Sequence, residues 1–289
     1  MATKYTAMFN DVMPLMSQIS EDEASVAKKH GIPLFKGVLY EEMDDGFGNP
    51  LLRKINDNTV VIGGAVLALE HITGITNCWK PATLNSIYNL NTPESMAASD
   101  LSSRICLFGV GSGGANLDFG SYLDPDPKQR NLASLIPMRF NSTIKGTDSD
   151  KYYFKIPEVD GINYKWYLKE MESEAVIRTL WKDSLEEGVD GTEVTDEIYN
   201  SNRTESLLSF AEYQIKLSAD DVHEYYKNIG DLDMARYNEL GLYTGQKVKL
   251  ASGETDYVNV RLFSYVTFNN KDVSSKTVSL YRYRIYAME

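Results

Sequence analysis

The residues that come closest to a reactive pattern are the glycines of Gly109-Val110-Gly111-Ser112-Gly113-Gly114, which follow the apolar run Ile105-Cys106-Leu107-Phe108. A strand that leads into a glycine-rich turn is how dinucleotide-binding folds present backbone N–H groups to a phosphate. That chemistry needs a helix directly after the glycines. Two Asp-Pro steps, in Asp124-Pro125-Asp126-Pro127, prevent such a helix, and no Walker lysine is present. The pattern therefore predicts a flexible loop from Gly109 to Gly120 that contacts neighbouring molecules, with a phosphate-ligand-binding enzyme as the alternative.

Other residue types that do chemistry are present, but not at the spacing that the chemistry requires. His30, His71 and His223 are far apart in the sequence, and none has a partner at zinc-ligand spacing. Cys78 and Cys106 are the only cysteines, and each lies in an apolar segment. This setting favours two buried free thiols in a reducing compartment over a disulfide framework. The sequence predicts no catalytic residue, no metal ligand and no cofactor.

The charge and hydropathy of the chain restrict its partners. The formal net charge is −12, whereas direct nucleic-acid binding needs a basic patch. The first residues, Met1 to Thr6, lack the apolar core of a signal peptide. The longest apolar run, Val60 to Leu69, has about half of the roughly 20 residues that a membrane-spanning helix needs. These features predict a soluble protein that contacts no membrane.

The first third of the chain, residues 1–98, is predicted to form a mainly helical region. Apolar spacing predicts helices over residues 5–30, over Thr59 to Ile72 and over Pro81 to Tyr88. Gly31-Ile32-Pro33 ends the first of these helical stretches, and Gly74 ends the second. The segment from Glu41 to Asn49 is rich in Asp, Gly and Asn, which is typical of a loop.

The remaining residues, 99–289, are predicted to form a β-rich body with long loops at 109–130 and 186–206. Short apolar runs bounded by Gly, Pro and Asn predict strands over Arg104 to Val110, Leu135 to Phe140 and Leu207 to Leu217. Two further runs, Lys151 to Ile156 and Asn163 to Leu168, flank an Asp-Gly turn and predict a hairpin.

Local residues leave the secondary structure of one segment of this body open and specify a helix in another. The residues from Ala175 to Leu185 are compatible with either a helix or a strand. By contrast, Ser218 followed by Asp221 predicts a capped helix that runs through Asn228 and ends at Gly230.

The clearest strand patterns lie near the C-terminus. One strand places five apolar residues on one face: Val258, Val260, Leu262, Val266 and Phe268. The next alternates Tyr281, Tyr283 and Ile285 with Arg282 and Arg284, and a change of parity near Leu280 indicates a bulge. We expect these two strands to pair as a C-terminal hairpin. The predicted fold class is α+β, with an N-terminal helical segment before a mainly antiparallel, β-sandwich-like body.

Three C-terminal segments carry a resemblance to a known class of proteins. They are Asn238-Glu239-Leu240-Gly241-Leu242-Tyr243, Arg261-Leu262-Phe263-Ser264-Tyr265-Val266-Thr267-Phe268 and Leu280-Tyr281-Arg282-Tyr283-Arg284-Ile285-Tyr286. On these segments residues 211 to 289, about a quarter of the chain, resemble the C-terminal region of virion structural proteins from tailed bacteriophages, particularly large contractile-tailed ones. Many members have a proline in the loop after the aromatic strand, where this chain has Asn269-Asn270-Lys271.

The resemblance implies a non-enzymatic structural protein, and we expect a component of the neck ring between portal and tail. The alternatives within the virion are the baseplate, the collar or fibre attachment, and the minor capsid proteins. A ring implies a homo-oligomer with heterologous interfaces, portal or other neck and tail proteins as partners, and DNA that passes through without specific binding. The expected location is the virion, after assembly in the host cytoplasm.

The residues expected to make these contacts come from the glycine-rich loop and from the first resembling segment. They are Gly109, Gly111, Gly113, Gly114, Phe119, Asn238, Glu239, Leu240, Gly241 and Tyr243. The 19 tyrosines are compatible with half-buried strands and wet interfaces, and also with a carbohydrate-binding β domain.

Overall fold

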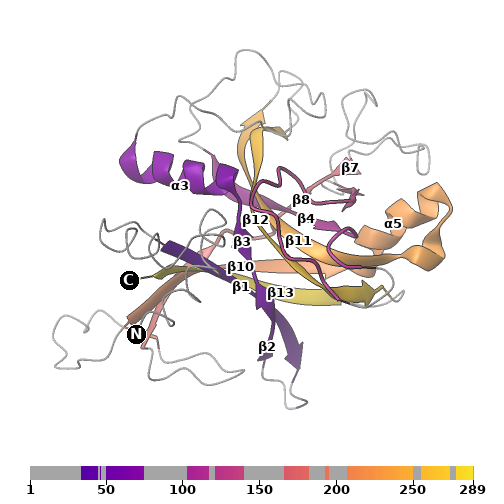
Figure 1. The fold of residues 1–289 in the computed structure, drawn as a ribbon, viewed down its shortest axis with the longest axis horizontal. Coiled ribbons are helices and arrows are strands. Elements are labelled where there is room, and N and C mark those ends of the chain that lie inside the picture. The colour runs from indigo at the N-terminus through magenta and orange to yellow at the C-terminus, as the bar shows by residue number, and fades with distance from the viewer. Residues whose placement is uncertain are drawn as a thin grey trace. The chain divides into compact units, whose positions relative to one another are not determined.

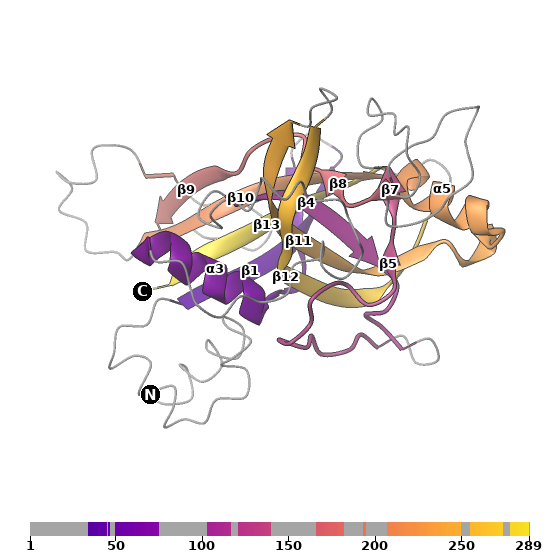
Figure 2. The same ribbon diagram turned by 90° about the horizontal axis from the view of Figure 1, so that it is seen from above.

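The computed structural model describes residues 34–44, 46, 50–74, 103–116, 121–139, 166–181, 193–194, 207–249, 255–273 and 278–288. The chain divides into two compact units, whose elements are labelled in Figures 1 and 2. Unit 1 comprises Met1–Thr59, Glu172–Leu217 and Ser279–Glu289, and unit 2 comprises Val60–Met171 and Ser218–Val278. The predicted boundary between residues 98 and 99 lies outside the described residues.

Unit 1 contains a five-stranded sheet, called sheet 1 below, in the order β2-β1-β13-β10-β9. Its strands are β1 (Leu34–Asp44), β2 (Pro50–Asp57), β9 (Val176–Trp181), β10 (Leu207–Ser218) and β13 (Val278–Met288). β1 pairs antiparallel with β2 and β13, and β9 pairs antiparallel with β10; β2 is labelled in Figure 1 and β9 in Figure 2. Leu34 lies opposite Met288, so strands from the two ends of the described chain are neighbours.

The interior of unit 1 depends on a close contact between β1 and the residue after β2. Leu39 and Tyr283 lie opposite each other in β1 and β13, and both are fully buried. Asn58 donates a hydrogen bond from Nδ2 to the hydroxyl oxygen of Tyr283 at 2.6 Å. The amide of Asn58 occupies the space that a Cβ atom at Gly37 would need, so glycine at this point of β1 makes room for the buried hydrogen bond.

Unit 2 contains a six-stranded sheet, called sheet 2, in the order β3-β12-β11-β4-β5, with β8 also paired to β4. Its strands are β3 (Thr59–Val60), β4 (Arg104–Gly111), β5 (Leu135–Ile136), β8 (Lys169–Glu170), β11 (Arg236–Lys249) and β12 (Thr255–Asp272). β11 pairs antiparallel with β12 on one side and with β4 on the other (Figure 1). Two short strands, β6 (Met138–Arg139) and β7 (Trp166–Tyr167), pair separately.

The core of unit 2 consists of aliphatic residues and tyrosines from sheet 2 and the segments that cover it. Its buried members are Val61, Leu107, Leu132, Leu135, Leu168, Tyr243, Tyr257, Val260, Leu262 and Tyr265. Helix α3 (Ile62–Thr73) packs so closely on β12 that a Cβ atom at Gly64 would overlap the carbonyl of Phe263. Between the same two elements, Glu70 and Arg261 are buried 3.9 Å apart.

Both helices of the described residues confirm local signals in the sequence. The helix predicted over Thr59 to Ile72 is α3, which begins at Ile62 and ends where Gly74 adopts a φ of 68°. The helix predicted after Ser218 is α5 (Ala219–Ile229), with a complete capping box between Ser218 and Asp221. A short 3-10 helix, η6 (Leu232–Met234), follows it.

Several strand predictions are confirmed as well. The runs that begin at Arg104 and at Leu207 form β4 and β10. The run that begins at Leu135 forms β5 and β6 on either side of Pro137, which has no N–H with which to pair. Val176–Trp181, in the segment compatible with helix or strand, is a strand.

The predicted α+β class is wrong, because the described residues are mostly β, in two sheets of antiparallel strands. The predicted helices over residues 5–30 and 81–88 lie outside the described residues. The part of the N-terminal region that is described begins with two strands, β1 and β2, before α3. The loop predicted from Glu41 to Asn49 begins too early, because β1 continues to Asp44. Glu41 forms an ion pair with Arg53 of β2, so its charge is neutralised within the sheet, and most of the segment after Asp44 lies outside the described residues.

The predicted C-terminal hairpin is wrong in its pairing. β12 pairs with β11 in sheet 2, whereas β13 pairs with β1 in sheet 1. Alternation predicted both strands correctly, but it does not specify which strand lies beside them. The predicted bulge is wrong too, because β13 stays in register with β1 from Leu280 onwards; Val278 and Leu280 are simply exposed.

Candidate functional site

The residues predicted to make contacts come from two distant segments, and the structure brings them together as neighbouring strands. Gly109 and Gly111 belong to β4, and Glu239, Leu240 and Gly241 belong to β11. In the register of this pair, Gly241 lies opposite Gly109, and Glu239 lies opposite Gly111. Tyr243, further along β11, lies opposite Leu107. All of these residues are buried in unit 2, and Phe119 lies outside the described residues.

The turn after β4 is held by the side chain of Asn238. Its Oδ1 accepts a hydrogen bond from the backbone N–H of Gly114 at 2.6 Å. Its Nδ2 donates to the carbonyl of Ser112 at 3.2 Å and to Oδ1 of Asn270 at 2.8 Å. Asn238 is fully buried, and these bonds satisfy its amide oxygen and both of its amide N–H donors within the protein. Asn238 therefore anchors the turn after β4.

Glu239 is the most unusual ionisable residue of this region. The residue is 2% exposed, and its carboxyl group accepts hydrogen bonds from the backbone N–H groups of Ala133 and Gly113 and from the side chain of Gln129, while its Oε2 atom has no hydrogen-bond partner. Burial raises the pKa of Glu239 to about 8, since desolvation penalises the charged form. A Cβ atom at Gly111 would lie 2.5 Å from Oε2. The glycines therefore make room for a carboxylic acid that is mostly protonated at neutral pH.

The segment 121–134, which overlaps the described end of the predicted loop 109–130, is held in place by tyrosine hydroxyls. Tyr243 donates to Oδ1 of Asn131 at 2.5 Å and accepts from the backbone N–H of Leu132 at 3.2 Å. Tyr265 donates to Oε1 of Gln129 at 2.8 Å. Burial raises the pKa of Tyr265, so its hydroxyl remains a proton donor at neutral pH. The described part of this loop is thus attached to sheet 2 at several points.

This geometry does not resemble a phosphate-binding turn. Gly109 and Gly111 are strand residues, and the described residues between β4 and β5, 112–116 and 121–134, contain no helix of the kind that the chemistry needs after the glycines. A Cβ atom at Gly109 would lie 2.8 Å from the side chain of Leu168, so this glycine faces the core. Gly114 lies against Glu239, so a phosphate that approached this glycine would meet an acidic side chain. The small residues of β4 serve packing.

The histidines of the described residues occupy separate places. Nδ1 of His71 lies 3.4 Å from a guanidinium nitrogen of Arg104, and burial, together with that charge, lowers the pKa of His71. His223 contacts the carbonyl of Val273 through Nε2 at 2.8 Å. Over the described ranges, no group of three His, Cys, Asp or Glu side chains is arranged to hold a metal ion. His30 lies outside these ranges.

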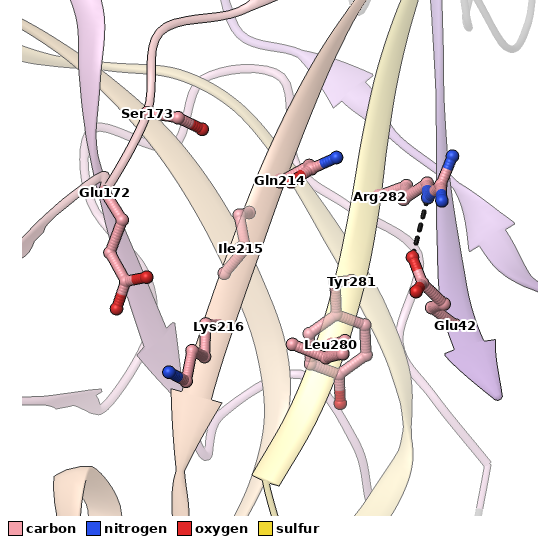
Figure 3. Close-up of a pocket in the computed structure, with 9 residues that line it drawn as sticks. All are labelled: Glu42, Glu172, Ser173, Gln214, Ile215, Lys216, Leu280, Tyr281 and Arg282. Atoms are coloured by element: carbon pink, nitrogen blue, oxygen red, sulfur yellow. Dashed lines mark hydrogen bonds and ion pairs between the residues drawn. The ribbon is translucent and has the colours of Figure 1, made fainter. Parts of the chain in front are cut away.

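Unit 1 contains a groove of about 440 Å³ on sheet 1 (Figure 3). Its lining residues are Glu42, Glu172, Ser173, Gln214, Ile215, Lys216, Leu280, Tyr281 and Arg282. In Figure 3 Arg282 points toward Glu42, and its Nε donates to Oε2 of Glu42 at 2.7 Å. A second bond runs from Nη1 of Arg282 to Oε1 of Glu212 at 3.3 Å. Because Arg282 is already neutralised, and Lys216 and Glu172 carry opposite charges, the groove favours neither anions nor cations.

Beside the groove lies a charge cluster that sequence reasoning did not identify as a unit. Nε of Arg284 donates to Oε2 of Glu212 at 2.7 Å, and both side chains are 5% exposed. The guanidinium carbon of Arg284 lies 4.6 Å from the ring centre of Phe210 and 5.1 Å from that of Tyr40. The alternation of Arg282 and Arg284 in the sequence showed that both occupy one face of a strand. It did not show that this face is buried or that β10 supplies the acid.

Among the described residues, neither helix has the length and apolar character that crossing a membrane requires. Comparison of the chain with protein-family models, with curated proteins and with solved structures found no match.

Proposed function

We propose that the protein is a non-enzymatic structural protein of a tailed-phage virion, in which it forms part of the neck ring between portal and tail. The observation that carries the proposal is the place of the resembling segments in the fold. Asn238–Tyr243 and Arg261–Phe268 are on the adjacent strands β11 and β12 of sheet 2. Leu280–Tyr286 is on β13, an inner strand of sheet 1. The resemblance therefore concerns the scaffolds of both units.

The burial of these segments supports a shared scaffold rather than a shared ligand site. Leu240, Leu242 and Val266 are fully buried in sheet 2, and Tyr283 is fully buried in sheet 1. Residues at such positions are constrained by packing, since interiors are close-packed. Proteins that share this interior can vary their surfaces to fit different places in a virion. This is why the resemblance supports membership of the virion more directly than the neck in particular.

The edges of the two sheets offer surfaces for assembly. Sheet 1 ends at β2 and β9, and sheet 2 ends at β3 and β5. Exposed apolar side chains lie on the outer strands of sheet 1, with Leu51 at 37%, Val176 at 56% and Ile177 at 80% exposure. Exposed apolar side chains on an edge strand are typical of a surface that another chain covers. Subunits of a ring meet through such surfaces with different faces in contact.

The charge of the chain is compatible with a conduit for DNA. A net charge of −12 disfavours retention of a polyanion, so a ring of such subunits would let DNA pass without binding it. This part of the proposal is tested by DNA retention. We expect no shift of DNA mobility with the assembled ring, and a ring that retards DNA at physiological salt would contradict it.

The proposal as a whole is tested in virions. We expect antibodies against the chain to label intact particles at the junction of head and tail, and negative-stain images of the released component to show symmetric rings. Particles assembled without the protein serve as the labelling control. Absence of the chain from purified particles would overturn the proposal. Labelling at the baseplate, fibres or capsid would keep a structural role and reject the neck.

A further inference from the structure

β9 combines exposed apolar side chains with an outer edge on which no described strand pairs with residues 176–178. β9 is the last strand of sheet 1, and its ladder with β10 runs from Val176 to Trp181. Val176 is 56% exposed, and Ile177, at 80%, is among the most exposed large apolar residues of the described chain. An edge of this kind is a template on which a further strand can pair.

One hydrogen bond shows which residues of β9 point their backbone N–H and C=O groups away from β10. The N–H of Val194 donates to the carbonyl of Thr179 at 2.8 Å, on the side of β9 away from β10. In an antiparallel strand both polar groups of a residue point to the same side, and the side alternates along the strand. Ile177 therefore also points its N–H and C=O groups away from β10, and the same alternation, continued one residue beyond the start of β9, would give Ala175 this direction. Residues 193–194 cover the edge at Thr179, and no other described segment covers it at residues 174–178.

We propose that the segment Glu174-Ala175-Val176-Ile177-Arg178 pairs antiparallel with the same segment of a second copy of the chain, about a twofold axis at Val176. The pairing joins sheet 1 of the two copies into one continuous sheet.

The segment is complementary to itself in size and charge. With Val176 on the axis, Glu174 lies opposite Arg178 of the second copy, and Ala175 lies opposite Ile177 of the second copy. Opposite charges that face each other stabilise cross-strand pairs. The outward backbone groups of Ala175 and Ile177 are the ones that exchange hydrogen bonds in this register. Arg178, which contacts Glu193 at 3.4 Å, gains a second carboxylate.

The other side chains of β9 are compatible with this pairing. Val176 lies opposite Glu212 of β10, and Arg178 lies opposite Phe210, so both share one face of sheet 1. The two Val176 side chains form a pair without mutual hydrogen bonds, the kind in which side chains approach most closely. Since this contact is isologous, it is not itself a heterologous contact of a ring. It occupies the β9 edge of sheet 1 and leaves the β2 edge for other contacts, and its test does not depend on the proposed virion role.

Cysteine cross-linking tests the register. Across the axis, the two Cα atoms at position 176 are expected about 4.5 Å apart, within the range of a disulfide, whereas position 177 faces position 175 on the other face. We expect Val176→Cys to form a disulfide-linked dimer under mild oxidation at least about tenfold faster than Ile177→Cys, although Ile177 is the more exposed residue. Both variants retain Cys78 and Cys106, so the wild-type chain is the common background. Equal or faster linkage through position 177 would overturn the proposed register.

Light scattering on the full chain tests the contact itself. We expect the wild-type chain to dimerise as its concentration rises, and Ile177→Lys and Ile177→Pro to abolish this. The proline variant removes only an outward N–H, which an edge strand tolerates, so it should keep the circular dichroism of the wild type. Ile72→Lys, at a 61% exposed position of α3, is the matched control and should still dimerise. A wild-type chain that is monomeric at about 100 μM, or a control that loses the dimer equally, would overturn the proposal.

Discussion

Arg284 and Glu212 form a buried ion pair, with Nε of the arginine 2.7 Å from Oε2 of the glutamate and both side chains 5% exposed. The pair links β13 to β10 inside sheet 1, and the rings of Phe210 and Tyr40 lie beside the guanidinium. Loss of the acid would leave the Arg284 guanidinium buried without a carboxylate, whereas loss of Arg284 would still leave Glu212 in contact with Arg282 at 3.3 Å.

Removal of the acid should therefore be costly. We expect Glu212→Gln to lower the free energy of unfolding by about 3–5 kcal/mol, since Arg284 would remain charged and buried without its partner. Urea denaturation measures this change. Lys54→Ala is the control: it breaks an ion pair with Asp57 in which the lysine side chain is 52% exposed, and it should cost less than about 1 kcal/mol. Equal losses in the two variants would contradict the importance assigned to burial.

Glu239 should make stability depend on pH. Its pKa of about 8 in the folded protein lies above the ordinary value of 4.5, so the folded state binds more protons between these values. Stability is therefore highest below pH 4.5 with respect to this group, and it falls as the pH rises to about 8. The full shift corresponds to roughly 5 kcal/mol. Above pH 8 the loss from this residue is complete.

Glu239→Gln should remove that dependence. We expect the thermal unfolding temperature of the variant to stay higher than that of the wild type at pH 9, and the difference to shrink toward pH 5. Glu193→Gln, which changes an acid whose side chain is 57% exposed, should follow the wild-type profile. Parallel pH profiles for wild type and Glu239→Gln would show that the carboxyl group does not titrate as described.

Substitution of Gly64 by a larger residue should destabilise the protein. A Cβ atom there would overlap the carbonyl of Phe263, so Gly64→Ala must move α3 away from β12. Such overpacking typically costs about 1–3 kcal/mol, more than the roughly 1 kcal/mol by which alanine favours a helix over glycine. We expect a net loss of stability in chemical denaturation. Ile72→Ala, at an exposed position of the same helix, should change stability by less than about 0.5 kcal/mol. A stabilised Gly64→Ala variant would show that the helix packs less closely.

Cys106 should be unreactive in the folded protein. Burial raises its pKa to about 12, and its thiol donates to the carbonyl of Gly245 at 3.7 Å. In a Cys78→Ser variant, we expect alkylation of Cys106 at pH 8 to accelerate by roughly 100-fold or more on unfolding, because the thiolate is the reactive form. The reciprocal Cys106→Ser variant reports on Cys78 alone. Similar rates in folded and unfolded protein would contradict the raised pKa of the partly buried Cys106.

Local residue chemistry determined the elements whose signals lie within a few positions. Ser218 and Asp221 specified the start of α5, and Gly230 its end, because a capping box and a left-handed glycine act on adjacent backbone groups. Alternation likewise determined that Arg261–Phe268 and Leu280–Tyr286 are strands. Local patterns did not determine the fold class, and the predicted α+β class was wrong. The acids of β1 were interpreted as a loop because their cross-strand partners are distant in the sequence.

Tertiary structure alone decided which strands are neighbours. β13 pairs with β1, with Met288 opposite Leu34, and no local pattern connects positions so far apart. The same holds for the region expected to make contacts: the sequence singled out the glycines of β4 and the segment around Glu239 separately. Their shared place in sheet 2, and the raised pKa of Glu239, arise from packing between the strands. Strand alternation determines which face a side chain occupies, whereas burial of the whole chain selects the partner strand, and with it which charges are buried and which edges stay open.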